Sequence, residues 1–210
     1  MRKFLSALGR RLGSRSGSGG ATPPKGPSDP RWLSLAGREW TCGHCKQIHT
    51  GLFEFGAHAP GFWEGEADYA ANGELGRFTP FLSEDFCVIE ESHFVRAVLP
   101  LPLVGWEGQT FAYGVWVSLA EPNFKRYVEQ FDATVVDESQ AWFGWLSTRL
   151  AGYPDTLLLK TDVHPRNDRQ RPVVMIQPSE HTLYVEQRDG VTFDRLMEIY
   201  ALHGHGPTRH

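Results

Sequence analysis

The sequence has few cysteines, no long apolar run and no excess of positive charge, and each shortage excludes a class of protein. Three cysteines among 210 residues are too few, and odd in number, for a secreted disulfide scaffold. No apolar run approaches the roughly 18 residues that a membrane-spanning helix needs. The net charge of −4 argues against nucleic-acid binding through bulk charge. We therefore expect a cytoplasmic protein without a transmembrane segment and without a nucleic-acid partner for its folded part.

The chain divides into a basic tail and an acidic body. Residues 1–31 carry seven basic side chains and one acidic side chain, a charge of +6, so the remainder carries −10 of the total of −4. Thirteen of the eighteen residues in 13–30 are Gly, Ser or Pro, a composition that cannot form a core. We expect a disordered tail over residues 1–30 and a single domain over residues 31–210. Hydrophobic residues make up 40% of the whole chain, which is typical of a globular protein.

The first twelve residues combine apolar side chains at nearly helical spacing with basic side chains and no acidic ones. One interpretation is a short amphipathic helix that touches an anionic membrane surface, and another is a targeting peptide. A third is an extension without function, since a helix this short is marginal alone. The apolar residues are Phe4, Leu5, Leu8 and Leu12, and the basic ones are Arg2, Lys3, Arg10 and Arg11.

Hydrophobic periodicity predicts the elements of the body. Alternation predicts strands over residues 94–98 and 111–119, and branched residues predict short strands over 86–89, 157–163, 173–176 and 183–186. Helices are predicted from Pro122 to Phe131 and after Thr192, with a shorter one over residues 141–150. The order shows no βα alternation. It predicts an α+β fold with a mainly antiparallel sheet and helices on one side.

The string TCGHCKQIH contains the most informative spacing. Cys42 and Cys45 are separated by two residues, which lets both sulfurs face one ion, as in a zinc knuckle, and His49 is four residues further on. With Cys87 these residues would make a Cys₃His set if the predicted strand over residues 86–89 folds against the knuckle. We expect the zinc ion to be structural, because four protein ligands leave no position for water. The alternative is that all three cysteines are reduced thiols and that Cys87 belongs to the core.

The same four residues, CGHC, resemble the active-site string of protein disulfide isomerases. Redox chemistry of that type needs the first cysteine at a helix N-terminus inside a βαβ unit. Here no clear strand precedes Cys42, and Gly51 ends any following helix within two turns. The sequence therefore gives only weak support to a thiol–disulfide exchange function.

Two further groups are candidates for ligand binding. Basic side chains at the ends of predicted strands can form an anion pocket, and tryptophans can line a groove for a peptide or small molecule. Each group has a plain alternative, the solvated surface for the first and the core for the second. The candidates are Lys160, His164, Arg171 and His181 for the anion pocket, and Trp116, Trp142 and Trp145 for the groove.

Several strings, taken in order, resemble a bacterial family of unknown function, the DUF2199 domain. They include the Cys42–Cys45 pair with His49, then DFCVI, GVWVSL, FGWL and GYPDT, and the likeness runs from about residue 40 to about residue 202. The resemblance implies no particular reaction. It implies that Cys42, Cys45, His49 and Cys87 belong together. Lys46 stands where the family usually has a glycine, which would permit a left-handed turn.

These observations favour a non-enzymatic, zinc-stabilised module that binds a protein or a small ligand. The alternative from the basic side chains is a hydrolase or transferase that acts on an anionic substrate. No sequence feature identifies the partner.

Overall fold

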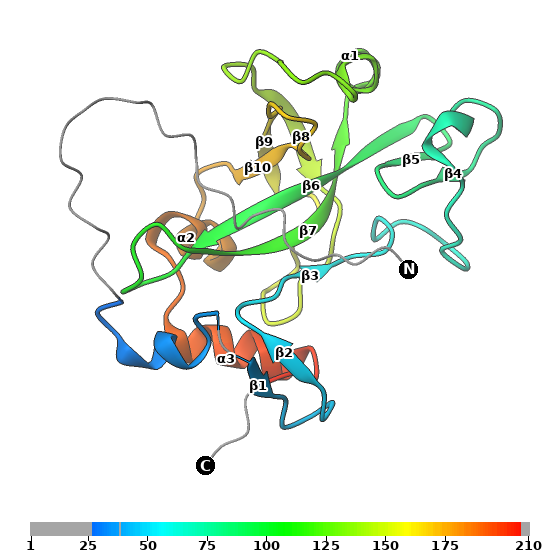
Figure 1. Ribbon diagram of the computed structural model, residues 1–210. Coiled ribbons are helices and arrows are strands. Elements are labelled where there is room, and N and C mark those ends of the chain that lie inside the picture. Colours follow the sequence, from blue (N-terminus) through cyan, green and yellow to red (C-terminus); the bar gives the residue numbers. More distant parts are fainter. Residues whose placement is uncertain (1–26, 38, 207–210) are drawn as a thin grey trace.

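The computed structural model describes residues 27–37 and 39–206 (Figure 1). Most of the expected tail, and with it the amphipathic segment, lies outside the described residues. The last tail residues belong to the fold. The Ser28 amide donates a hydrogen bond of 2.7 Å to the Gly105 carbonyl, and the Asp29 side chain caps the 3₁₀ helix η1 (Pro30–Ser34).

Five strands form a closed barrel at the centre of the molecule. They are β6 (Ser92–Pro102), β7 (Thr110–Leu119), β8 (Trp142–Leu146), β9 (Lys160–His164) and β10 (Val173–Ile176). Each pairs with the next in antiparallel orientation, and β10 pairs in parallel with β6 to close the ring. The mainly antiparallel α+β architecture is as predicted, but the sheet closes on itself.

Shorter strands extend the barrel or stand apart from it. The hairpin of β4 (Phe81–Leu82) and β5 (Phe86–Ile89) continues from β6, and β3 (Phe55–Gly56) lies parallel to β7. The hairpin of β1 (Glu39–Thr41) and β2 (Ile48–Thr50) is separate from the large sheet. A short 3₁₀ helix, η2 (Asn72–Glu74), precedes β4.

Strand β7 is buried on both faces, as its apolar alternation predicts. Odd-numbered positions such as Phe111, Tyr113 and Val117 join the main core, while Trp116 packs on the other face with Cys87 and other apolar residues. Gly114 lets β3 run close against β7. A Cβ atom there would lie 3.3 Å from the Gly56 Cα atom.

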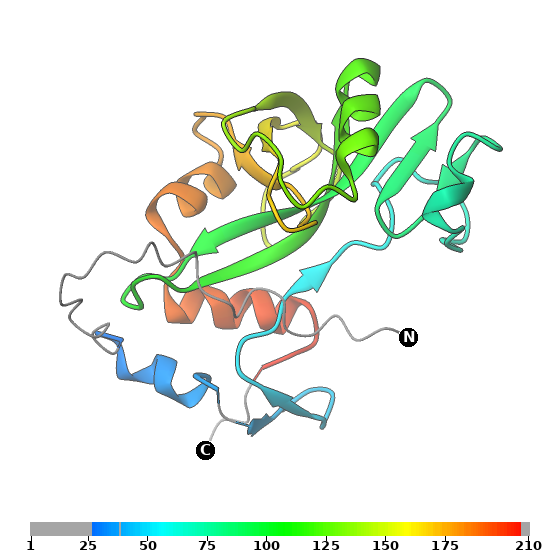
Figure 2. The ribbon, with the colours of Figure 1, turned by 45° about the horizontal axis from the view of Figure 1, so that its top comes forward.

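Helices α1 (Glu121–Gln130) and α3 (Phe193–Leu202) form where their apolar spacing predicts. The Thr192 side chain accepts a hydrogen bond from the Arg195 amide and so caps α3 as expected. The helices do not share one side. Figures 1 and 2 show α1 and α3 at opposite ends of the barrel, with α2 (Thr182–Asp189) beside β6 and β10.

Two element predictions are wrong. Residues 183–186 lie in helix α2, where Leu183 and Gln187 are buried one helical turn apart. Residues 142–146 form strand β8 in place of a helix, with Trp142, Gly144 and Leu146 turned inward and Phe143 and Trp145 outward. The aromatic side chains of this segment alternate, which is the period of a strand. No helix in the described part of the chain has the length and apolar character that a bilayer crossing requires.

Candidate metal centre

Four cysteine and histidine side chains converge where the N-terminal hairpin meets the C-terminal end of the chain. Cys42 and Cys45 lie in and beside the turn between β1 and β2, His49 lies on β2, and His205 follows α3. One ligand atom from each residue lies within 4.8 Å of the ligand atoms of the other three. Figures 1 and 2 show the hairpin beside the end of α3.

The hairpin backbone explains why the two cysteines face the same point. The Cys42 amide donates to the Gln47 carbonyl, and the Lys46 amide donates back to the Cys42 carbonyl, which closes a tight turn. Within it the amides of His44 and Cys45 both point at the Cys42 sulfur, at 3.4 Å. Lys46 completes the turn with a φ of 61°, the left-handed conformation that the expected glycine would adopt without strain.

The spacing of the donor atoms fits a tetrahedral ion. Zn–S and Zn–N bonds of about 2.3 and 2.0–2.1 Å place sulfur and nitrogen about 3.6 Å apart around one ion. The Cys45 sulfur lies 3.3 Å from His49 Nε2, and the Cys42 sulfur lies 3.9 Å from His205 Nδ1. Two thiols and two imidazoles are also a donor set of structural zinc sites.

The surroundings favour the thiolate form of Cys42. The side chain is buried, and burial by itself raises the pKa of this thiol. The amide groups of Cys45 and His44 outweigh it because they donate to the sulfur, so the pKa falls to about 6. The Cys45 side chain and the Gly206 backbone lower this pKa further, and a thiolate is the form in which cysteine binds a metal.

Aromatic rings hold the two histidines in place. The His49 ring stacks on Phe53, with centroids 4.6 Å apart, and His205 meets Phe53 edge-on at 5.0 Å. Tyr200 of α3 fixes Phe53 in turn, since its hydroxyl donates to the Phe53 carbonyl and accepts from the Phe53 amide. The Gly43 amide also donates to the Gly206 carbonyl at 2.7 Å. The C-terminal segment is therefore anchored on the hairpin independently of any ion.

Cys87 lies elsewhere, although the sequence grouped it with the other three. It sits on β5 opposite Phe94 and packs with Leu82 and Trp116 in a second apolar cluster. Burial raises the pKa of the Cys87 thiol to about 12, so the side chain stays protonated. The structure brings His205 to the cluster in its place.

The sequence does not point to His205, because no local pattern relates the chain after Gly204 to the CxxC pair. The distance along the chain from Cys42 is 163 residues. Histidines are frequent near this C-terminus, but no spacing rule relates them to the CxxC pair. Only the packing of α3 against the hairpin shows which histidine belongs to the cluster.

The tryptophans named as groove residues divide between core and surface. Trp116 is fully buried and its indole donates to the Ala57 carbonyl, and Trp142 is 5% exposed. Both belong to cores, which contradicts a groove built from them. Trp145 is 37% exposed and lies edge-on to Phe143, with centroids 5.0 Å apart, so only this part of the set reaches solvent.

The basic candidates do not form one pocket. Lys160 and His164 occupy opposite ends of β9, about 13 Å apart at the usual rise of a strand. Arg171 is bound to the Asp85 carboxylate at 2.8 Å, and the His181 ring accepts from the Leu183 amide as the cap of α2. The structure therefore gives no geometric basis for the expected anion pocket.

Comparison with known families is consistent with this description. Residues 41–191 match the family described as an uncharacterised protein conserved in bacteria, DUF2199. The chain belongs to this family. It matches no curated protein and no solved structure. The DUF2199 match includes Cys42, Cys45 and His49 but ends before α3, so His205 lies outside the matched segment.

Proposed function

We propose that this protein is a zinc-stabilised binding module, with Cys42, Cys45, His49 and His205 as ligands of a structural zinc ion. The observation that carries the proposal is the convergence of these four donor atoms within 4.8 Å from two distant parts of the chain. Four protein ligands leave no open position for water, so the ion would serve the fold and not a reaction.

The role of the ion follows from what its ligands join. Three ligands come from the β1–β2 hairpin, which is separate from the large sheet, and the fourth follows α3. A zinc ion would therefore tie the two ends of the domain together and would supply folding free energy directly. Trp40 is the one buried side chain on the two hairpin strands. Because so little of the hairpin is buried, a bound zinc ion would add substantially to its stability.

The binding role is supported by exposed aromatic surface on the barrel wall. Phe143 and Trp145 on β8 are 44% and 37% exposed, and Met175 on β10 is 40% exposed. Phe143 and Met175 both pair with Asp162 of the intervening strand, so they flank it on one face. Exposed aromatic and methionine side chains are common at binding surfaces. None of the three cysteines forms a disulfide, which fits a reducing compartment, and we place the module in the cytoplasm on that basis.

The test is zinc content by elemental analysis of the purified untagged protein. We expect one zinc ion per wild-type chain and a loss of zinc in the Cys42→Ser and His205→Ala variants. His44→Ala is the matched control, because His44 lies inside the same turn but outside the cluster and contributes only its backbone amide. This variant should keep its zinc.

The Cys87→Ser variant separates the two possible ligand sets. Retention of zinc in this variant supports His205 as the fourth ligand, whereas loss of zinc with intact circular dichroism would favour Cys87. A wild-type chain that binds no zinc under reducing, chelator-free conditions would refute the proposal.

A further inference from the structure

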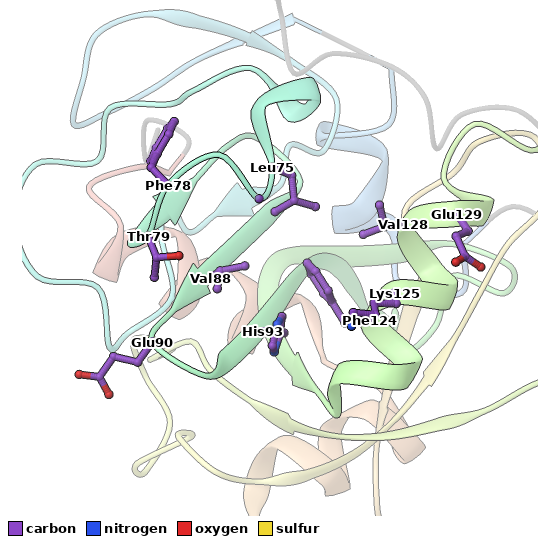
Figure 3. Close-up of a pocket in the computed structure, with 11 residues that line it drawn as sticks. Leu75, Phe78, Thr79, Val88, Glu90, His93, Phe124, Lys125, Val128 and Glu129 are labelled. Carbon is purple, nitrogen blue, oxygen red and sulfur yellow. The ribbon is translucent and has the colours of Figure 1, made fainter.

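A groove lies between α1, the β5–β6 hairpin and the loop before β4, far from the cysteine and histidine cluster (Figure 3). Its volume of about 460 Å³ is in the range of binding pockets. The floor and walls are apolar, with Phe124 of α1 buried beneath and Phe78 of the loop 48% exposed above. The other apolar side chains in the groove are Leu75, Val88 and Val128.

The groove has an excess of negative charge around it. Glu90 and Glu129 lie at its two ends, as Figure 3 shows, and neither carboxylate has an ion-pair partner among the described residues. The one lysine in the lining, Lys125, is already bound to Glu121 at 2.7 Å. An occupant that carries positive charge at both ends of an apolar stripe would match this surface.

Residues 1–12 of the same chain have that pattern. Phe4, Leu5, Leu8 and Leu12 follow nearly helical spacing, with two basic residues before them and two more near the end. At 1.5 Å per residue, the two basic pairs of a helix would be about 12 Å apart. The segment has no acidic residue. An amphipathic helix in an apolar groove is a common recognition mode.

The connecting segment is long enough to reach. The described chain begins at the β6–β7 turn, where Ser28 bonds to Gly105, and the groove lies at the other end of β6, next to His93. That span is at most about 40 Å at the rise of an extended strand. Residues 13–27 cover up to about 50 Å when extended. Tethering would also raise the local concentration of the segment to about the millimolar range.

We propose that residues 1–12 dock into this groove of their own chain, with Phe4, Leu5 and Leu8 on the apolar floor and the basic pairs near Glu90 and Glu129. The tail then covers the groove and competes with any other basic amphipathic segment for it. This proposal is independent of the zinc site, which lies on the opposite side of the barrel beside α3.

The test is carbodiimide cross-linking of the full-length protein, read by mass spectrometry. This reagent joins a lysine amine directly to a carboxylate in contact with it. Lys3 should form an amide with Glu90 or Glu129. A Leu8→Asp substitution should lower the yield of this cross-link by about tenfold, because it removes a buried apolar contact and adds a like charge. The yield should also fall as salt increases.

A matched pair of groove variants separates docking from non-specific contact. Val128→Asp places a charge in the groove, whereas Val135→Asp places the same charge on a side chain that is 79% exposed outside it. We expect only Val128→Asp to abolish the cross-link. Since Val128 also packs against the core, the Leu8→Asp result stands as the test if this variant unfolds.

Mixing ¹⁵N-labelled and unlabelled protein distinguishes the source of the segment. Cross-linked peptides of a single isotope composition support docking within one chain. Mixed-isotope cross-links would overturn the proposal in favour of a second copy. The absence of any link from Lys3 to Glu90 or Glu129 would overturn it altogether.

Discussion

Lys46 adopts a left-handed backbone conformation in the turn between the two cysteines and His49. This conformation costs a residue with a Cβ atom about 1–2 kcal/mol, and it costs glycine almost nothing. The lysine recovers part of that through its ammonium group, which donates to the Gly43 carbonyl at 2.6 Å. The turn therefore keeps its shape without the glycine that the family resemblance leads one to expect.

Lys46→Gly should raise the free energy of unfolding by about 0.5–1 kcal/mol. The relief of backbone strain in the folded state exceeds the loss of the bond from the lysine ammonium group to the Gly43 carbonyl and the gain in entropy of the unfolded chain. Urea unfolding of the wild-type and variant chains measures this difference. Lys46→Ala is the control, since it removes the ammonium group and keeps the Cβ atom. An alanine variant as stable as the glycine variant would contradict the assignment of strain to the backbone.

Cys45 and Cys87 should differ in their reactivity toward thiol reagents. Cys45 is exposed, whereas Cys87 is buried with a pKa of about 12. In chelator-treated native protein, iodoacetamide should label Cys45 and leave Cys87 unmodified between about pH 7 and pH 9, because the reagent can reach Cys45, whereas Cys87 is buried and protonated. Peptide mass spectrometry after labelling with and without urea checks this. Labelling of Cys87 in the folded state would show that β5 opens locally.

At the scale of the element, helix α2 completes the barrel where two strands barely pair. Strands β10 and β6 share a single pair, Val173 with Val98. The buried Gln187 side chain of α2 bridges β10 and β6 where the two strands do not pair with each other. It accepts from the Ile176 amide at 2.7 Å and donates to the carbonyls of Val174 and Pro100. One amide thus satisfies backbone groups of both strands.

Gln187→Met should lower the free energy of unfolding by about 3 kcal/mol, because a side chain of similar length would leave these buried backbone groups without partners. Thermal and urea unfolding provide the measurement. Gln177→Met serves as the control, since Gln177 bonds to Asp162 in a less buried position. Equal losses in the two variants would show that Gln187 has no special role in closing the barrel.

The two wrong element predictions have a common physical cause. Residues 183–186 combine branched and aromatic side chains that favour strands, and residues 142–146 are aromatic at positions that also suit a short helix. In segments this short, packing decides. Gly144 on β8 illustrates it, because a Cβ atom there would lie 2.5 Å from the Ser118 carbonyl oxygen. That contact exists only when β8 lies against β7.

At the scale of the whole molecule, the candidate metal centre connects parts that the barrel does not connect. The β1–β2 hairpin forms strand pairs only with itself, and its contacts with the rest of the molecule include Trp40, which packs against Phe53 and Tyr200, and the segment after α3. Removal of an ion at this point should loosen the hairpin and the chain end before it affects the barrel.

We compare the protein with free zinc in large excess over its Kd and the same protein after chelation. Chelation should lower the Tm by about 10 °C. Hydrogen exchange should increase over residues 39–50 and after residue 202 and stay unchanged in β6 and β7. The His205→Ala variant should lose its response to the chelator, while His44→Ala should keep it. A uniform increase in exchange across the barrel would contradict a local role for the ion.

The sequence by itself determined the elements whose pattern is long and consistent. Strand β7, helix α1 and helix α3 with its Thr192 cap follow from local periodicity, and so do the CxxC pair and His49, which are close along the chain. Only the tertiary structure brought His205, and not Cys87, close to the other three side chains, placed Trp116 and Trp142 in the core, and closed the sheet into a barrel. These outcomes depend on contacts between residues far apart in sequence, and the energy of such contacts is set by packing that no local pattern encodes.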